Sequence, residues 1–166
     1  QMNPHFLFNT LNSIYFLALR KSDSTPDVIL KLSDLMRFLL TESTAETIPL
    51  EKEVECIRQY IDLQQLRLTG KTEIVFKTNG TVDNQSITPL LLLPFVENAF
   101  KLGVSSNTPS TIFISLTEQN DRLAFIVRNS KVNSIRSEEN TGTGLNNVKR
   151  RLNLSYPGKH ALMIRE

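Results

Sequence analysis

The sequence has few of the residues that most often identify an enzyme, because it contains one cysteine, Cys56, and two histidines, His5 and His160. A single cysteine cannot form an intrachain disulfide, which is compatible with a reducing compartment. These three side chains are also spaced too widely for a typical metal-binding motif. The Gly-x-Ser-x-Gly turn of many serine hydrolases is absent as well. The sequence therefore indicates neither a disulfide framework, nor a zinc site, nor that kind of hydrolase.

Strong charge and long apolar runs are missing too. The formal net charge is +2, which is too near neutral to favour direct binding to nucleic acid or to a membrane surface. No apolar run approaches the roughly 20 residues of a membrane span, and no signal peptide is visible. The chain has an ordinary globular composition, 40% hydrophobic and 22% charged. Because Gln1 comes directly before a predicted helix, we expect the chain to be a segment of a longer protein.

The residues before Gly70 have helical periodicity throughout. One helix is predicted over residues 3–21, a second begins at Ser24 or Thr25, and a third ends near Leu68. Apolar residues recur along the second helix at helical spacing, at Val28, Leu32, Leu35 and Leu39. Wide apolar faces of this kind predict a helical hairpin that pairs with a second copy into a dimeric four-helix bundle.

After Gly70 the pattern becomes α+β. The predicted elements are a strand at 72–78, a helix at 87–103, a β-hairpin at 111–129, a helix at 145–154 and a last strand at 160–164. The stretch "SKVNSIRSEENTGTG" between the hairpin and the next helix is a polar loop, and loops of that length in compact domains are usually functional or disordered. We therefore expect two domains, residues 1–69 and 70–166.

The first helix contains a polar stripe in "NPHFLFNTLNSI". At about 3.6 residues per turn, His5, Asn9 and Asn12 align beside the apolar face. A lone histidine near the start of a helix is usually a surface or capping residue, so the stripe alone assigns no function.

A second group of polar residues interrupts the apolar helix "PFVENAFK". Glu97, Asn98 and Lys101 could simply form its solvent edge. Functionally, an asparagine oxygen is a suitable ligand for Mg²⁺ beside phosphate oxygens, and a neighbouring carboxylate could position a proton or a water. Lys101, one turn on, could meet a phosphate.

The third motif, "TGTGLNNVKRR", places Gly142 and Gly144 at the start of a helix. Glycines there let the backbone approach an anion, which the free N–H groups of a helix start favour. The basic run at 149–151 is predicted to be a solvated helix face. Asn129, at the end of a strand, could pair with an adenine edge.

Taken together and in this order, these stretches resemble one family. "NPHFLFNTLNSI", "LSDLMRFLL", "PLEKEVECIRQYIDLQQLR", "PFVENAFKLG" and "TGTGLNNVKRRLNLSYPG" are similar to the transmembrane sensor histidine kinases of the LytS/YehU type, over nearly the whole chain. The last two motifs are shared more widely among Bergerat-fold ATPases.

The resemblance implies a histidine phosphotransfer region followed by a Bergerat-type α/β sandwich that binds ATP. His5 would be the phosphorylated residue, and Asn9 would hydrogen-bond its ring. Asn98 would hold Mg²⁺ in the ATP site, with Glu97 and Lys101 nearby. The polar loop would be the ATP lid. The remaining nucleotide-binding positions would be Asn129, Gly142, Gly144 and Leu145.

The same resemblance implies partners and a location. The core would be a homodimer that passes the phosphoryl group to an aspartate in the receiver domain of a response regulator. It would be the cytoplasmic part of a sensor anchored in the plasma membrane. The stimulus, the identity of the regulator and the choice between cis and trans phosphorylation are not encoded in these motifs.

Three positions depart from the family pattern. Leu102 stands where the family commonly has histidine, and Asn129 begins "NSK" where many relatives have Asp-x-Gly. Phe6 stands where many histidine kinases have an acidic residue, so a general base must come from elsewhere, with Glu97 the first choice. Leu102 and Asn129 favour an alternative reading, a degenerate nucleotide-binding dimer scaffold that signals without a phosphorelay. A third reading, an ATPase without phosphorelay, conflicts with "NPHFLFN".

Overall fold

The computed structural model describes residues 4–68, 70–80, 85–132 and 143–165. The chain divides into two compact units, Gln1–Thr72 with Val82–Pro89, and Glu73–Thr81 with Leu90–Glu166. Helices and sheets are both present, which confirms the α+β class. The assignment of the two predicted domains to dimerisation and ATP binding stays a prediction, as do the four-helix bundle and the Bergerat fold.

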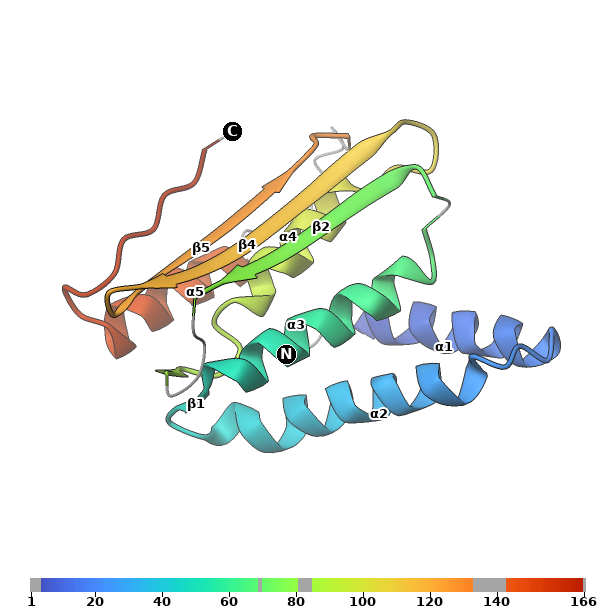
Figure 1. Cartoon of the computed structure of the whole chain (residues 1–166), viewed down its shortest axis with the longest axis horizontal. Coiled ribbons are helices and arrows are strands. Elements are labelled where there is room, and N and C mark those ends of the chain that lie inside the picture. Colours follow the sequence, from blue (N-terminus) through green and yellow to red (C-terminus); the bar gives the residue numbers. More distant parts are fainter. Residues whose placement is uncertain (1–3, 69, 81–84, 133–142, 166) are drawn as a thin grey trace. The chain divides into compact units, whose positions relative to one another are not determined.

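Three helices make up most of the first unit (Figure 1): α1 (Pro4–Leu19), α2 (Thr25–Thr41) and α3 (Leu50–Gln65). A short 3-10 turn, η1 (Glu42–Thr44), and a two-residue strand, β1 (Ile48–Pro49), connect α2 to α3. The strand β3 (Ser86–Ile87) returns to this unit and pairs antiparallel with β1. The backbone N–H of Leu50 extends the pairing by donating to the Gln85 carbonyl at 2.8 Å.

The core of the first unit follows the predicted helical seam in α2. Val28, Leu32 and Leu35 are buried, whereas Leu39 is only half-buried. These residues meet the apolar face of α3, which includes Ile57. An ion pair between Lys31 and Asp62 also joins the two helices. The apolar seam predicted for the second helix thus lies on the face of α2 that packs on α3.

The helix ends differ from the predicted bounds by a few residues. The first helix ends at Leu19 because Lys21 adopts a left-handed backbone conformation, φ 51°, that a right-handed helix excludes. The third ends at Gln65, three residues before Leu68. Ser24 occupies the N-cap position of α2, but its side chain makes no capping hydrogen bond.

The second unit contains a three-stranded sheet and two helices: β2 (Thr72–Asn79), α4 (Leu93–Gly103), β4 (Ser110–Gln119), β5 (Arg122–Asn129) and α5 (Thr143–Ser155). The strand order is β2-β4-β5. The predicted hairpin is confirmed, since β4 and β5 are antiparallel and pair from Ile112 with Asn129 to Gln119 with Arg122. Asn120 and Asp121, both with positive φ, form the tight turn, as two-residue hairpin turns require.

The helix α4 packs on β4 and β5 and covers one face of the sheet (Figure 1). Ile112, Ile114 and Leu116 alternate along β4 and are fully buried. The ring of Phe95 on α4 lies 6.3 Å from that of Phe125 on β5. This packing fixes one side of α4 in the core and leaves its other side for polar residues.

One predicted helix is wrong in part, and one predicted strand is wrong. Residues 87–92 are not helical, since Leu90 has a positive φ of 54° and the helix begins only at Leu93, with Pro94 in its first turn. The last predicted strand, 160–164, is not formed, because among the described residues the sheet ends at β5 and no ladder partner takes up this segment. Most of the predicted ATP lid, residues 133–142, lies outside the described part of the chain.

Candidate functional site

His5 lies exposed in the first turn of α1, one helical turn before Asn9. The amide nitrogen of Asn9 is 3.1 Å from the His5 Nδ1 and 3.1 Å from its Nε2, which confirms the predicted contact. An amide N–H donates only to a ring nitrogen with a lone pair. The contact therefore holds the exposed ring beside Asn9, and the role of each ring nitrogen in it depends on the tautomer.

The side chain of Phe6, the residue after His5, is buried in the core rather than exposed. Phe6 is 3% exposed, and its ring stacks on that of Tyr60 in α3. The position that carries an acidic residue in many histidine kinases is thus a core position in this chain. Phe6 itself therefore offers no proton acceptor beside His5.

The second polar group lies on α4. Glu97 and Asn98 are half-buried and Lys101 is exposed. At roughly 100° per residue, these three fall away from the face on which Val96 and Phe100 are buried. They are thus held on the outer side of a helix whose inner side is fixed in the sheet core.

The surroundings of Glu97 perturb the ionisation of its carboxyl. Burial raises the pKa of its carboxyl above the ordinary value of 4.5, because desolvation disfavours the charged form. A carboxylate with a raised pKa accepts a proton more readily near neutral pH than an exposed one. The burial thus gives Glu97 a property that a general base needs.

The end of β5 lies against the end of α4. A Cβ atom added to Gly103 would lie 2.7 Å from the Cβ of Asn129. The backbone N–H of Val132 donates to the Leu102 carbonyl at 3.4 Å, and the Asn129 amide donates to the Ser130 carbonyl at 3.0 Å. Two motifs that are distant in sequence, "PFVENAFKLG" and the end of the hairpin, therefore meet in the second unit.

The third motif opens α5. Gly142 lies outside the described residues, Gly144 is exposed with open space around its Cβ position, and Leu145 is half-buried. The prediction that residues 149–151 form a solvated helix face is wrong for Arg151, which is half-buried. Its Nη1 donates to the Leu90 carbonyl at 3.0 Å. No sequence signal marks this contact, because its acceptor is a backbone atom of a residue in a left-handed conformation.

The predicted residues thus fall into two groups. His5 and Asn9 belong to the first unit, whereas Glu97, Asn98, Lys101 and Asn129 belong to the second. A shallow pocket of about 520 Å³ on the β4–β5 hairpin, lined by residues such as Thr117 and Arg122, contains none of them. Within the described residues, no cluster of three or more histidine, cysteine or acidic side chains could hold a metal. A Mg²⁺ that keeps its waters and binds substrate phosphates needs only one or two protein ligands, so Asn98 fits that chemistry.

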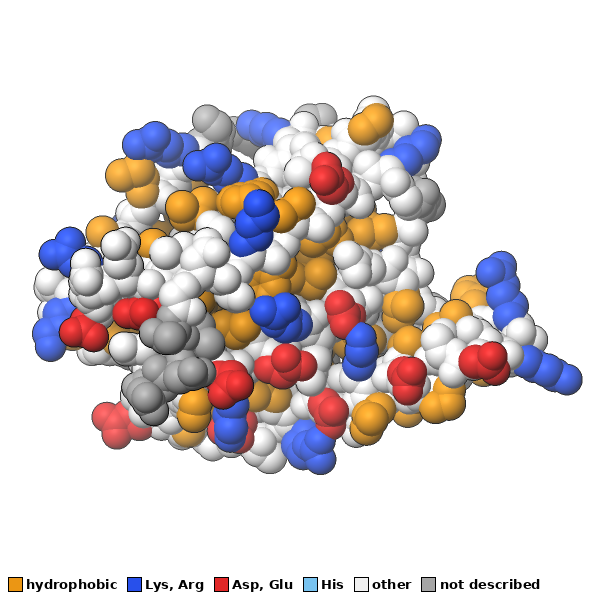
Figure 2. All heavy atoms as spheres, viewed as in Figure 1, with side chains coloured by type: hydrophobic (Ala, Val, Ile, Leu, Met, Phe, Trp, Pro, Cys, Tyr) orange, Lys and Arg blue, Asp and Glu red, His pale blue; other side chains and the backbone are white. Residues whose placement is uncertain are grey.

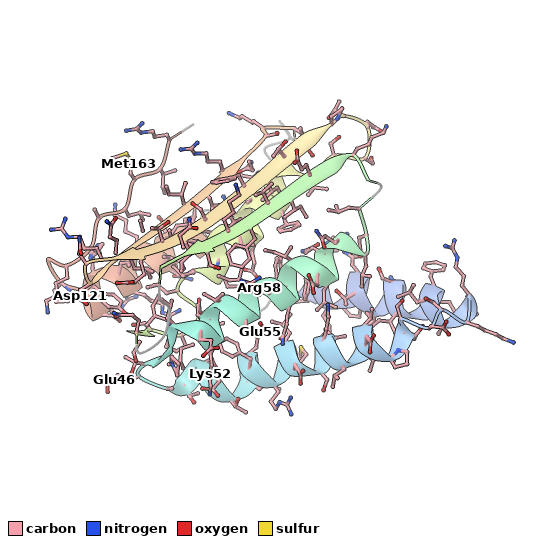
Figure 3. The ribbon with its side chains drawn as sticks, in the orientation of Figure 1. Glu46, Lys52, Glu55, Arg58, Asp121 and Met163 are labelled. Carbon is pink, nitrogen blue, oxygen red and sulfur yellow. The ribbon has the colours of Figure 1, made fainter. Side chains whose placement is uncertain are left out.

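Charged side chains of both signs mix over the helices of the first unit (Figure 2). Lys52, Glu55 and Arg58 follow one another along α3 (Figure 3), and Lys52 pairs with Glu42 at 2.7 Å. On the face that Figure 2 shows, the described helices of this unit carry no block of one sign.

Comparison with known proteins gives the family. Residues 1–72 match the histidine kinase family. The chain is 30% identical over 175 residues to the sensor protein LytS of Staphylococcus haemolyticus and 26% identical over 177 residues to that of Enterococcus faecalis, covering 98% and 99% of this chain. It is also 34% identical over 120 residues, 72% of this chain, to an uncharacterized sensor-like histidine kinase of Staphylococcus epidermidis.

Residues 1–72 thus belong to the histidine kinase family, and the chain is similar along nearly its whole length to sensor proteins of the LytS type. It spans 30% of the length of the two LytS relatives and 23% of the third. Among the described helices, none combines the length and apolar character needed to cross a membrane.

Proposed function

We propose that this chain is the catalytic core of a two-component sensor histidine kinase that phosphorylates itself on His5 with ATP. The observation that carries the proposal is the exposed His5 imidazole in contact with the Asn9 amide, within the segment that matches the histidine kinase family. The phosphoryl group then passes to the receiver aspartate of a response regulator.

In this proposal, ATP binds to residues of the second unit. Asn98 holds Mg²⁺ with its carbonyl oxygen, Lys101 and the Gly144 backbone meet the phosphates, and Asn129 meets the adenine edge. Gly142 and Leu145 complete the phosphate-binding segment. When bound, Mg²⁺ neutralises charge on the phosphates. The close packing of Gly103 on Asn129 supports the assignment, because it fixes the adenine-side residue relative to the helix that carries Asn98.

The chemistry needs the neutral His5 imidazole to reach the γ-phosphorus. A ring nitrogen forms the new N–P bond as the bond from the γ-phosphorus to the β,γ-bridging oxygen breaks, and ADP leaves with that electron pair. The other ring nitrogen releases its proton, which the Glu97 carboxylate accepts. Asn9 orients the ring without adding charge.

A homodimer is supported by apolar side chains that the first unit leaves exposed. On α1 these are Phe8, Leu11, Tyr15, Phe16 and Leu19, and on α2 they are Ile29, Leu30 and Leu40. Apolar side chains are visible among charged ones along these helices in Figure 2. Exposed apolar side chains gathered on two neighbouring helices favour an interface there, and a paired hairpin gives a four-helix bundle. The parent protein is then a membrane-anchored sensor with this core in the cytoplasm.

A second function, a nucleotide-binding dimer scaffold without phosphorelay, is favoured by Asn129. Its amide already donates to the Ser130 carbonyl, and it lacks the charge that an aspartate would bring to adenine. The experiment that separates the two functions is incubation of the dimer with Mg²⁺ and γ-labelled ATP. The kinase acquires label that is acid-labile and base-stable, as a phosphoramidate is, whereas the scaffold acquires none.

A further inference from the structure

His5 occupies a place in its helix that is difficult to keep ordered. It is the second residue of α1, and the first turn of any helix has backbone N–H groups without helical partners and tends to fray. The first turn of α1 also lacks an acidic residue that would interact with the helix dipole. Contacts with another helix add support to a first turn of this kind.

That support comes from the adjacent residue. The Phe6 and Tyr60 rings stack with centroids 4.8 Å apart and an interplanar angle of 28°. Phe6 and Tyr60 are 3% and 4% exposed, so the stack lies in the core of the first unit. Thr10, one turn on and fully buried, donates from its Oγ1 to the Phe6 carbonyl at 2.9 Å. The Thr10 bond strengthens the first turn of α1 from within, and the stack packs the buried side of that turn on α3.

Tyr60 is itself held in place. The Gln64 amide, one turn further along α3, donates to the Tyr60 hydroxyl at 2.7 Å. Gln64 is buried as well, so the phenol has its polar partner inside the core. The ring that supports Phe6 therefore belongs to a rigid part of α3.

We propose that Tyr60 is a positioning residue for the phosphorylation of His5. Successive residues of a helix point about 100° apart, so pinning Phe6 on Tyr60 sets the direction in which His5 leaves α1. Asn9, one turn on in the same helix, turns with His5 and stays beside its ring. This inference rests on the proposed function, because it assigns α3 a part in the autophosphorylation of α1.

The test compares Tyr60→Leu, which removes the stack, with Tyr60→Phe, which keeps the ring and loses only the bond to Gln64. Leu35→Ala is the matched control, since it destabilises the same unit from α2, where Leu35 is fully buried. The first readout is the initial rate of label transfer to His5 in the 166-residue chain, at saturating Mg²⁺-ATP and as a function of ATP concentration. The second is the NMR spectrum of the His5 ring without nucleotide, with the His160 ring as internal reference.

We expect Tyr60→Leu to lower the maximal rate at least about tenfold with the KM for ATP unchanged, and to move the His5 ring signals. Tyr60→Phe and Leu35→Ala should stay near the unmutated chain in both readouts. A normal rate and unmoved His5 signals in Tyr60→Leu, or an equal loss of rate in Leu35→Ala, would overturn the inference. If Tyr60→Leu does not fold, Phe6→Leu removes the same stack from the other side.

Failure of the proposed function gives a different pattern. If the unmutated chain takes up no label, the kinase assignment fails, and the ring signals alone decide on positioning. In that case His5 signals that move in Tyr60→Leu and not in Leu35→Ala support the structural part of the inference, and signals that do not move refute it.

Discussion

Gly103 and Asn129 are packed so closely that a Cβ atom on Gly103 would lie 2.7 Å from the Cβ of Asn129. This distance is well inside van der Waals contact, so only glycine fits at the end of α4 without movement of β5. The contact joins the helix that carries Asn98 to the strand end proposed for adenine.

Replacing Gly103 by alanine should therefore damage both stability and the site. We expect Gly103→Ala to cost about 1–3 kcal/mol of folding free energy, as overpacked core positions do, and to weaken ATP binding by displacing Asn129. Thermal unfolding and calorimetry with ATP measure the two effects.

Gly144→Ala is the matched control, because nothing lies within 4 Å of its Cβ position. It should leave stability intact and weaken only ATP binding, since its backbone is proposed to meet the phosphates. Equal stability in Gly103→Ala would contradict the packing argument.

The predictable parts of this molecule are those in which periodicity and burial coincide. Alternation gave the buried residues Ile112, Ile114 and Leu116 of β4, and helical spacing gave Val28 and Leu32 of α2. Each of these patterns reports which face of an element avoids water, and this is a local property of the sequence.

The parts that could not be predicted depend on contacts between distant segments. The approach of Gly103 to Asn129 and the bond from Arg151 to the Leu90 carbonyl each join residues that no local pattern connects. The prediction of a last strand at 160–164 was wrong for a related reason, because a strand needs a neighbouring strand as well as an alternating sequence. His5 and Asn9 lie one turn apart, and their contact could be predicted because it is local.

Asn98→Ala tests the proposed magnesium ligand. We expect the affinity for Mg²⁺-ATP to fall at least about tenfold, because a charge-assisted interaction is lost, while the fold and the dimer survive. Calorimetry with and without Mg²⁺ measures the change, and light scattering checks the dimer. Unchanged Mg²⁺-ATP affinity would place the metal site elsewhere.

His5→Gln tests the phosphoacceptor. Glutamine keeps a polar side chain but has no nucleophilic nitrogen, so label from γ-labelled ATP should disappear while ATP binding stays unchanged. His160→Gln is the control and should label normally, since His160 contacts the Tyr156 carbonyl far along the chain. Label that persists in His5→Gln would show that another residue accepts the phosphoryl group.

Tyr15→Glu tests the proposed dimer face. Tyr15 is 59% exposed on α1, so a charge there should spare the fold but weaken self-association at least about tenfold if α1 is buried in the interface. Light scattering over a concentration series measures this. Asn153→Glu, exposed on α5, adds the same charge elsewhere and should leave the dimer unchanged. Equal behaviour of the two variants would remove α1 from the interface.

Glu97→Gln separates the stability of the site from its chemistry. Burial raises the pKa of Glu97, so the protonated carboxyl is favoured in the folded state. The contribution of protonated Glu97 to the free energy of unfolding is fully present below the ordinary pKa. It is lost as the pH rises through the raised pKa of the folded chain. Glutamine mimics the protonated form at every pH. We therefore expect Glu97→Gln to have the same melting temperature as the unmutated chain at about pH 4. At about pH 8 its melting temperature should be higher than that of the unmutated chain.

The same substitution should lower the rate of label transfer about 100-fold if Glu97 accepts the His5 proton, while the affinity for Mg²⁺-ATP changes little. Lys101→Gln is the comparison on the exposed side of α4, and it should weaken ATP binding without the pH-dependent gain in melting temperature. A normal label-transfer rate in Glu97→Gln would exclude the carboxylate as the base. A melting temperature no higher than that of the unmutated chain at about pH 8 would show that its burial carries no ionisation penalty.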